Sequence, residues 1–152
     1  MKTMPRPRLS ESQLRSRYKE ALHLMQSGDE KSIQIAVLYF RHLSDYGLGR
    51  ASYNTAVAYS RGVGVAKDPS RAAQFMLTAA KQGHAKSYRP LADMILRGEL
   101  PVCRNLPDDC RRLMAAQWLA RGRRSLGLFR TPEFDPNRVS GLYQALGTVG
   151  YR

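Results

Sequence analysis

The side chains that most often carry out catalysis or bind metal are few in this sequence and lie far apart. The histidines are His23, His42 and His84, and none stands at metal-ligand spacing from another ligand. Cys103 and Cys110 are too few for a closed zinc site, because no histidine lies near them. Free thiols are favoured over a disulfide between them in a reducing compartment. The sequence predicts no metal site.

Paired carboxylates occur at Asp108 and Asp109. They suit the start of a helix, where negative side chains stabilise the positive end of the helix dipole. No serine–histidine–aspartate or cysteine–histidine set follows from the spacing of the remaining residues. The sequence therefore predicts no catalytic residue, no cofactor and a chain that is not an enzyme.

Two glycines in "GVGVAKDPS", residues 62–70, could belong to a phosphate-binding loop or to a turn between helices. A P-loop needs Gly-Lys-Ser/Thr after its glycines, and a dinucleotide-binding fold needs a preceding strand. Here a helix precedes Gly62 and Gly64, and Asp68 would repel a phosphate from the next helix. Both glycines can adopt positive φ in a tight turn. The stretch is predicted to be an interhelical turn.

The elements that must position these residues are all predicted to be helices. Ser10 and Gln13 form a capping box, and Asp68-Pro69 is a typical helix start. No segment alternates apolar and polar residues as a strand does. Helices are predicted at about 10–27, 29–47, 49–61, 68–83, 87–97, 108–122 and 135–147.

An internal repeat links these helices. Residues 36–47 align with residues 72–83, and residues 51–62 align with residues 87–98, both at an offset of 36. A helix pair repeated at this period is a solenoid unit, which needs its neighbours to bury its apolar face. The predicted fold is all-α: a right-handed α-solenoid of antiparallel helix pairs with about seven helices.

Alanines, aromatic residues, glycines and a few polar residues follow a specific order through residues 51–84. They are Ala51, Tyr53, Asn54, Tyr59, Gly62, Gly64, Val65, Asp68, Ala72, Phe75, Ala79, Ala80, Gly83 and His84. This stretch resembles one full Sel-like repeat, a relative of the tetratricopeptide repeat. Thr55 and Ala56 replace the leucine and glycine usual in the family. The resemblance implies a helical adaptor that assembles complexes, of a kind common in bacteria and generally without catalytic activity.

The predicted organisation follows the repeats. Residues 1–9 are predicted to be a flexible basic N-terminus, followed by a solenoid over residues 10–122. Its units are a partial repeat at about 10–47, a full repeat at 48–84 and a degenerate repeat at 85–122. An Arg-rich connector, 123–134, and a C-terminal capping helix and tail, 135–152, complete the prediction. The chain lacks a membrane-length apolar run and the apolar core of a secretory signal, so a cytoplasmic location is predicted.

The charge balance favours an acidic partner. The chain holds 25 Lys and Arg against 12 Asp and Glu, a net charge of +13. Such a surface attracts acidic proteins, polyanions such as nucleic acid, and anionic lipid, and charge alone selects none of them. Resemblance to tetratricopeptide-type grooves implies that the first helices of the pairs line the partner site, with these candidates: Ser52, Asn54, Arg61, Arg89 and Arg97. Each of the five could instead be structural, and Asn54 in particular could cap or bridge neighbouring helices.

Arginines also cluster in residues 104–130, where the candidate electrostatic patch consists of Arg111, Arg112, Arg121, Arg123 and Arg124. This cluster could be a solvated basic face or a surface for an acidic protein. The alternative function is association with nucleic acid, although no recognisable nucleic-acid module accompanies the arginines. The leading hypothesis remains a non-catalytic adaptor that binds a protein partner through the solenoid groove.

Overall fold

The structure is a computed structural model that describes residues 7–125, and its regular elements in that range are all helical. The α-helices are α1 (Glu11–Gln26), α2 (Glu30–Asp45), α3 (Gly49–Arg61), α4 (Pro69–Lys81), α5 (Tyr88–Leu96) and α6 (Asp108–Ser125). Two short 3₁₀ helices, η1 (Ala85–Ser87) and η2 (Pro101–Cys103), flank α5. The all-α prediction is confirmed, and the helix predicted at 135–147 lies outside the described residues.

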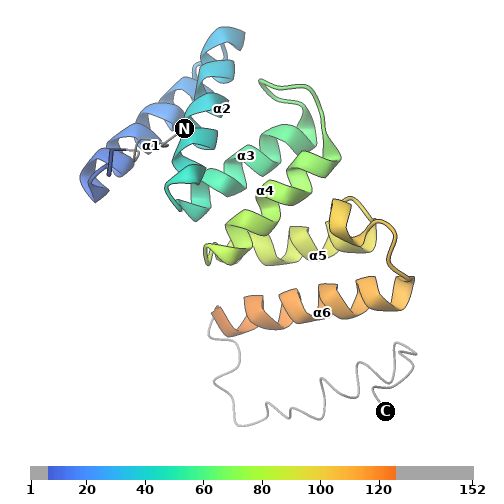
Figure 1. Ribbon diagram of the computed structural model, residues 1–152. Helices are drawn as coiled ribbons and strands as arrows, with labels where there is room; N and C mark the ends of the chain where they lie inside the picture. The colour runs from blue at the N-terminus through green and yellow to red at the C-terminus, as the bar shows by residue number, and fades with distance from the viewer. Residues whose placement is uncertain (1–6, 126–152) are drawn as a thin grey trace, which may run out of the picture.

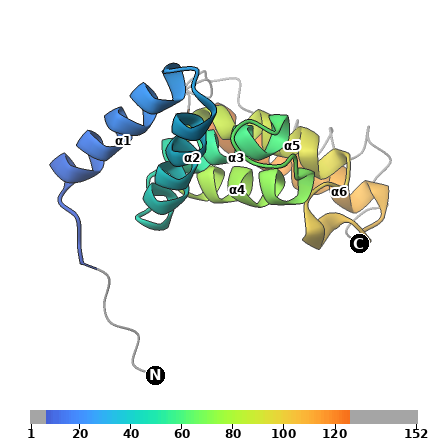
Figure 2. The same cartoon turned by 90° about the horizontal axis from the view of Figure 1, so that it is seen from above.

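The helices form successive antiparallel pairs: α1 with α2, α3 with α4, and α5 with α6 (Figure 1). Each pair packs on the next through contacts of α2 with α3 and of α4 with α5. Helices α3 and α5 run in the same direction, while α4 and α6 return (Figure 1). Helices α1 and α6 lie at opposite ends of the described stack (Figure 2). This arrangement confirms the predicted α-solenoid.

The helix starts follow the predicted capping residues. The Ser10 hydroxyl accepts a hydrogen bond from the Gln13 amide at 3.2 Å, and the Gln13 side chain accepts one from the Ser10 amide at 2.9 Å. Asp68 caps α4 by accepting from the Arg71 amide at 3.0 Å, and Pro69 occupies the first helical position. These bonds satisfy amides that have no partner inside the helix.

Helix α6 runs further than the sequence predicts. The prediction ended it near Gly122, but Gly122 lies buried inside the helix against α5, where a Cβ would come within 2.7 Å of the Tyr88 Cβ. This glycine provides close helix contact rather than a helix end. Arg123 and Arg124, predicted to open the connector, therefore lie in the last turn of α6. Residues 126–134 of the predicted connector lie outside the described residues.

Small side chains dominate the contacts between helices. Four of the alanines in the predicted repeat pattern are at most 2% exposed, and they are Ala51, Ala72, Ala79 and Ala80. Larger buried side chains, including Phe40 and Met76, fill the space around them. A larger residue at an alanine position would overpack the contact, typically by about 1–3 kcal/mol. The repeat pattern therefore corresponds to the packing face of each helix.

A buried polar network joins three helices. The hydroxyls of Ser44 on α2 and Ser52 on α3 lie 2.6 Å apart. The Ser52 hydroxyl donates to the side-chain oxygen of Gln82, the C-cap residue of α4, at 2.6 Å. Gln82 in turn donates to the Ser44 carbonyl at 3.2 Å. Because each polar group has a partner, the network links the first pair to the second without an unsatisfied group.

Two turn glycines have the same backbone conformation and different surroundings. Gly64 has φ +70° and Gly83 has φ +83°. A Cβ on Gly64 would lie 2.9 Å from Ile33 Cγ2 and 3.1 Å from Val37 Cγ2, whereas a Cβ on Gly83 would meet nothing within 4 Å. Glycine is therefore required at position 64 by the positive φ and by the close contact with α2, and at position 83 by the positive φ alone.

Alanine substitutions at these glycines should separate the two requirements. Gly83→Ala is expected to lower the free energy of unfolding by about 1–2 kcal/mol, the cost of the left-handed conformation. Gly64→Ala should cost about 1–3 kcal/mol more, because its Cβ also meets α2. Urea denaturation of both variants measures the difference. Equal losses would contradict the close contact of the α3–α4 turn with α2.

Removing the central hydroxyl of the polar network should destabilise the fold. Ser52→Ala leaves the Ser44 hydroxyl and the Gln82 side chain short of a partner, so the free energy of unfolding should fall by about 1–3 kcal/mol. Ser16→Ala, at an exposed position of α1, is the matched control and should change it by less than about 0.5 kcal/mol. Thermal or urea unfolding measures both variants. If they were equally stable, the network would make no contribution to the stability of the fold.

Candidate functional site

A groove of about 330 Å³ lies between α3 and α5, with α4 contributing to its lining. Its lining residues are Tyr53, Val57, Ser60 and Arg61 of α3, Met76 of α4, and Arg89, Pro90, Asp93, Met94 and Arg97 of α5 and its C-cap. Arg61, Arg89 and Arg97 are three of the five residues that the sequence predicted to bind a partner. The structure brings these three together.

The arginines of the groove differ in their partners. Arg97 forms a two-bond ion pair with Glu99, with nitrogen–oxygen distances of 2.8 and 3.2 Å. The hydrogen bond to Glu99 raises the pKa of Arg97. Arg61 and Arg89 are exposed and form no ion pair or hydrogen bond with any residue between 7 and 125. Arg61 and Arg89 are therefore the cations available to a ligand.

Ser52 and Asn54 do not line the groove. Ser52 is fully buried in the network with Ser44 and Gln82, so its prediction as a partner-binding residue is wrong for the folded chain. Asn54 is half-buried, and its side-chain amide donates to the Tyr18 hydroxyl of α1 at 3.0 Å. Asn54 bridges neighbouring helices, which was the alternative that the sequence left open.

Tyr18 is the residue of this region that the sequence reasoning missed. Besides accepting from Asn54, its ring lies 5.6 Å from the Phe40 ring and 4.3 Å from the Arg50 guanidinium carbon. Tyr18 precedes Asn54 by 36 residues, so extending the repeat offset into the first helix would have placed the two on equivalent turns. Tyr18 holds α1 against α2 and α3.

His84 packs beside the groove rather than acting in it. Its ring centre lies 4.9 Å from that of Tyr53, and its backbone amide donates to the Ala79 carbonyl at 3.0 Å. The His84 Nε2 is buried without a hydrogen-bond partner in the described part of the chain. Burial lowers the pKa of His84, and the positive charges of Lys86 and Arg50 lower it further.

The predicted electrostatic patch is divided by its own ion pairs. Arg111 pairs with Asp108, and the guanidinium of Arg112 lies 4.0 Å from the Asp109 carboxylate. The Arg121 guanidinium carbon lies 4.8 Å from the ring centre of Trp118. These contacts neutralise or cover part of the positive charge that the sequence showed as one cluster. The other two arginines of the predicted patch, Arg123 and Arg124, lie in the last turn of α6.

The two cysteines do not pair with each other. Cys103 is buried, and its thiol lies 3.7 Å from the Met114 sulfur. Burial raises the pKa of the Cys103 thiol. Cys110 is exposed at the start of α6. Residues 7–125 contain no group of three or more His, Cys, Asp and Glu side chains placed to hold a metal ion.

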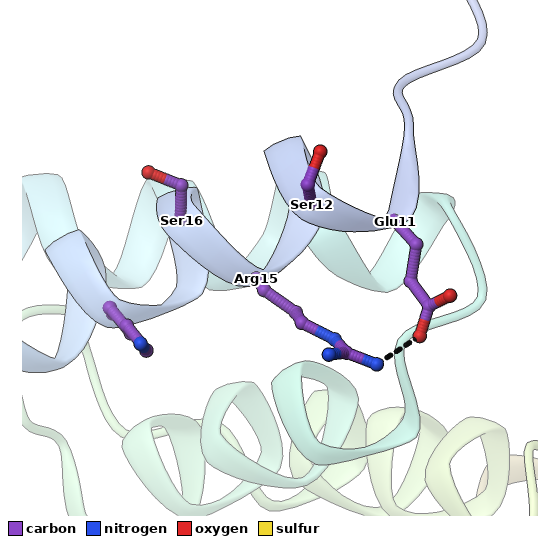
Figure 3. A pocket seen from close by; sticks show the side chains of 5 residues that line it. Glu11, Ser12, Arg15 and Ser16 are labelled. Atoms are coloured by element: carbon purple, nitrogen blue, oxygen red, sulfur yellow. Dashed lines mark hydrogen bonds and ion pairs between the residues drawn. The ribbon is translucent and has the colours of Figure 1, made fainter.

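A second hollow lies along the outer face of α1 (Figure 3). It is lined by Glu11, Ser12, Arg15, Ser16 and Lys19, and Glu11 and Arg15 form an ion pair there. These five residues are exposed and come from a single helix. The hollow has no apolar floor and no second wall, so the groove between α3 and α5 is the stronger candidate site. No helix in the described ranges is long and apolar enough to span a bilayer.

The lowered pKa of His84 predicts a pH effect on stability. Its folded pKa lies below the ordinary value of 6.5, so the unfolded chain binds the proton first as the pH falls. The contribution of His84 is thus complete above pH 6.5 and decreases as the pH falls below that value. Thermal unfolding at several pH values should show a steeper acid-side loss for the wild type than for His84→Phe. The exposed His23→Phe should keep the wild-type slope, and identical slopes in all three would contradict the prediction.

Comparisons with known proteins agree with this geometry. The structure is similar to that of a Sel1 repeat protein from Oxalobacter formigenes, with a TM-score of 0.63 and 22% sequence identity. The similarity covers 88% of this chain and 57% of that one, so this chain spans little more than half the length of its structural relative. No protein-family model matches the chain, and no curated protein matches it significantly. The helix pairs, the repeat residues and this structural similarity together show that the chain has the Sel-like repeat fold.

Proposed function

We propose that this chain is a non-catalytic scaffold that binds an acidic segment of a protein partner in the groove between α3 and α5. The observation that carries the proposal is the combination of an apolar floor with two arginines that have no partner among residues 7–125. Arg61 and Arg89 supply positive charge, and Val57, Met76 and Met94 supply apolar contact. A binding site of this kind gains affinity from buried apolar area and orientation from a few polar groups.

The structural relative supports the same class of role. Solenoid folds bind partners along the surfaces that their stacked repeats create. The lining of the groove offers charge and apolar contact rather than a nucleophile next to a base, so the proposed role is binding without chemistry. The net charge of +13 would speed the approach of an acidic partner. We further propose that the chain is bacterial, as the resemblance of its repeat residues implies, and that it acts in the cytoplasm.

Charge reversal in the groove should remove the partner. The double variant Arg61→Glu, Arg89→Glu should retain less than about a tenth of the partner that the wild type captures from a lysate. The new glutamates would repel the acidic side chains of the partner. The matched control is Arg17→Glu, Arg41→Glu, which reverses two exposed arginines outside the groove. Quantitative mass spectrometry of the captured proteins compares the three chains.

Nuclease treatment of the same lysate separates the two functions that the sequence left open. A protein partner should survive the nuclease, because it contacts the groove directly. Loss of all captured material after nuclease would contradict the scaffold and favour nucleic-acid association. Equal capture by the groove variant and the control would show that the partner binds elsewhere.

A further inference from the structure

The charges that line the groove follow an order along α5. Arg89 lies at the start of the helix, Asp93 one turn later and Arg97 at its C-cap, after a further turn. At a rise of 1.5 Å per residue, Arg89 and Arg97 are about 12 Å apart along the axis. Arg61 ends α3, which runs in the same direction as α5, so it lies at the Arg97 end (Figure 1). The available cations, Arg89 and Arg61, thus mark opposite ends of the groove.

The middle of the groove is apolar on its floor and negative at one side. Met76 and Met94 are 2% and 4% exposed, so they form a packed floor, and Val57 adds an apolar wall from α3. Asp93 is the one carboxylate among the described residues that line the groove. An apolar side chain would be accommodated here, whereas a carboxylate would meet the negative charge of Asp93.

This order matches an extended peptide. In an extended strand, residues i, i+2 and i+4 point to the same face, and residues i and i+4 are about 13 Å apart. That distance agrees with the rise of about 12 Å along α5 from Arg89 to Arg97, the end of the groove at which Arg61 also lies. The groove, at about 330 Å³, lies at the lower end of small-molecule sites, so it accommodates a few side chains of a segment.

We propose that the groove selects an extended segment with acidic residues at positions i and i+4 and an apolar residue at i+2. This inference rests on the proposed scaffold function and specifies the partner of the same site. The carboxylate at one end pairs with Arg89, and the carboxylate at the other pairs with Arg61, since Glu99 already occupies Arg97. The central apolar side chain contacts Met76 and Met94.

Three fluorescein-labelled synthetic peptides test the spacing on the full chain by fluorescence anisotropy. The first has the core Glu-Ala-Leu-Ala-Glu, the second has the same composition in the order Glu-Glu-Ala-Ala-Leu, and the third is Glu-Ala-Glu-Ala-Glu. The first should bind about tenfold more tightly than either of the others, because the second loses one charge-assisted contact and the third places a carboxylate beside Asp93. Arg61→Ala and Arg89→Ala should each weaken the first peptide about tenfold, and Arg41→Ala should leave it unchanged.

A substitution at Asp93 tests the central position independently. Asp93→Asn removes the negative charge with little change in shape. It should tighten binding of Glu-Ala-Glu-Ala-Glu severalfold more than binding of Glu-Ala-Leu-Ala-Glu, because only the first of these peptides places a carboxylate at the central position. If Asp93→Asn left the discrimination between these two peptides unchanged, the assignment of the central position would be wrong.

The remaining outcomes separate this inference from the proposed function. If all three peptides bound equally and all lost affinity in Arg61→Ala, the groove would bind acidic segments without the proposed spacing. If no peptide bound while the lysate partner still depended on Arg61 and Arg89, the scaffold would stand and the extended motif would be overturned. A labelled oligothymidylate that bound more tightly than every peptide, and lost affinity in Arg89→Ala, would overturn the motif in favour of nucleic acid.

Discussion

Close contact between helices through alanine is the constraint on which this structure depends. Ala36, Ala51, Ala72 and Ala79 are completely buried, and their short side chains let neighbouring helices pack closely. Alanine loses no side-chain entropy on folding and favours the helix intrinsically, so the same residue supports both the element and its packing. The larger side chains, such as Phe40, complete a packing whose separation the alanines set.

The groove inherits its shape from that packing. Its walls are helices from two successive pairs, and α4, which separates them, contributes Met76 to the floor. The polar network of Ser44, Ser52 and Gln82 links the second pair to the first through hydrogen bonds between three helices. Arg61 and Arg89 thus project from helices, so helix packing sets the backbone spacing between them.

The sequence predicted the repeat, the helices and the turns because each depends on local rules. Helix caps, glycine conformation and apolar periodicity all act within a few residues, and the offset of 36 joins them into pairs. It failed where a long-range contact decides the outcome. The sequence predicted Ser52 to line the groove, but the Ser52 hydroxyl bonds to Gln82 in the interior. It predicted Gly122 to end a helix, but Gly122 packs against Tyr88. Arg61, Arg89 and Arg97 were predicted as candidates, but their order around Asp93 required the fold.

The position of Tyr18 limits how many grooves the described residues form. In the first pair, Tyr18 bonds to Asn54 and packs on Phe40 and Arg50, so the region between α1 and α3 is occupied by the chain itself. The first helices of the three pairs are α1, α3 and α5. Within residues 7–125, the open groove between two of them is therefore the one between α3 and α5. Under the proposed function, residues 7–125 would engage one segment at a time. Avidity would then come from several copies held together, where tethering raises the effective concentration of each segment without any new contact.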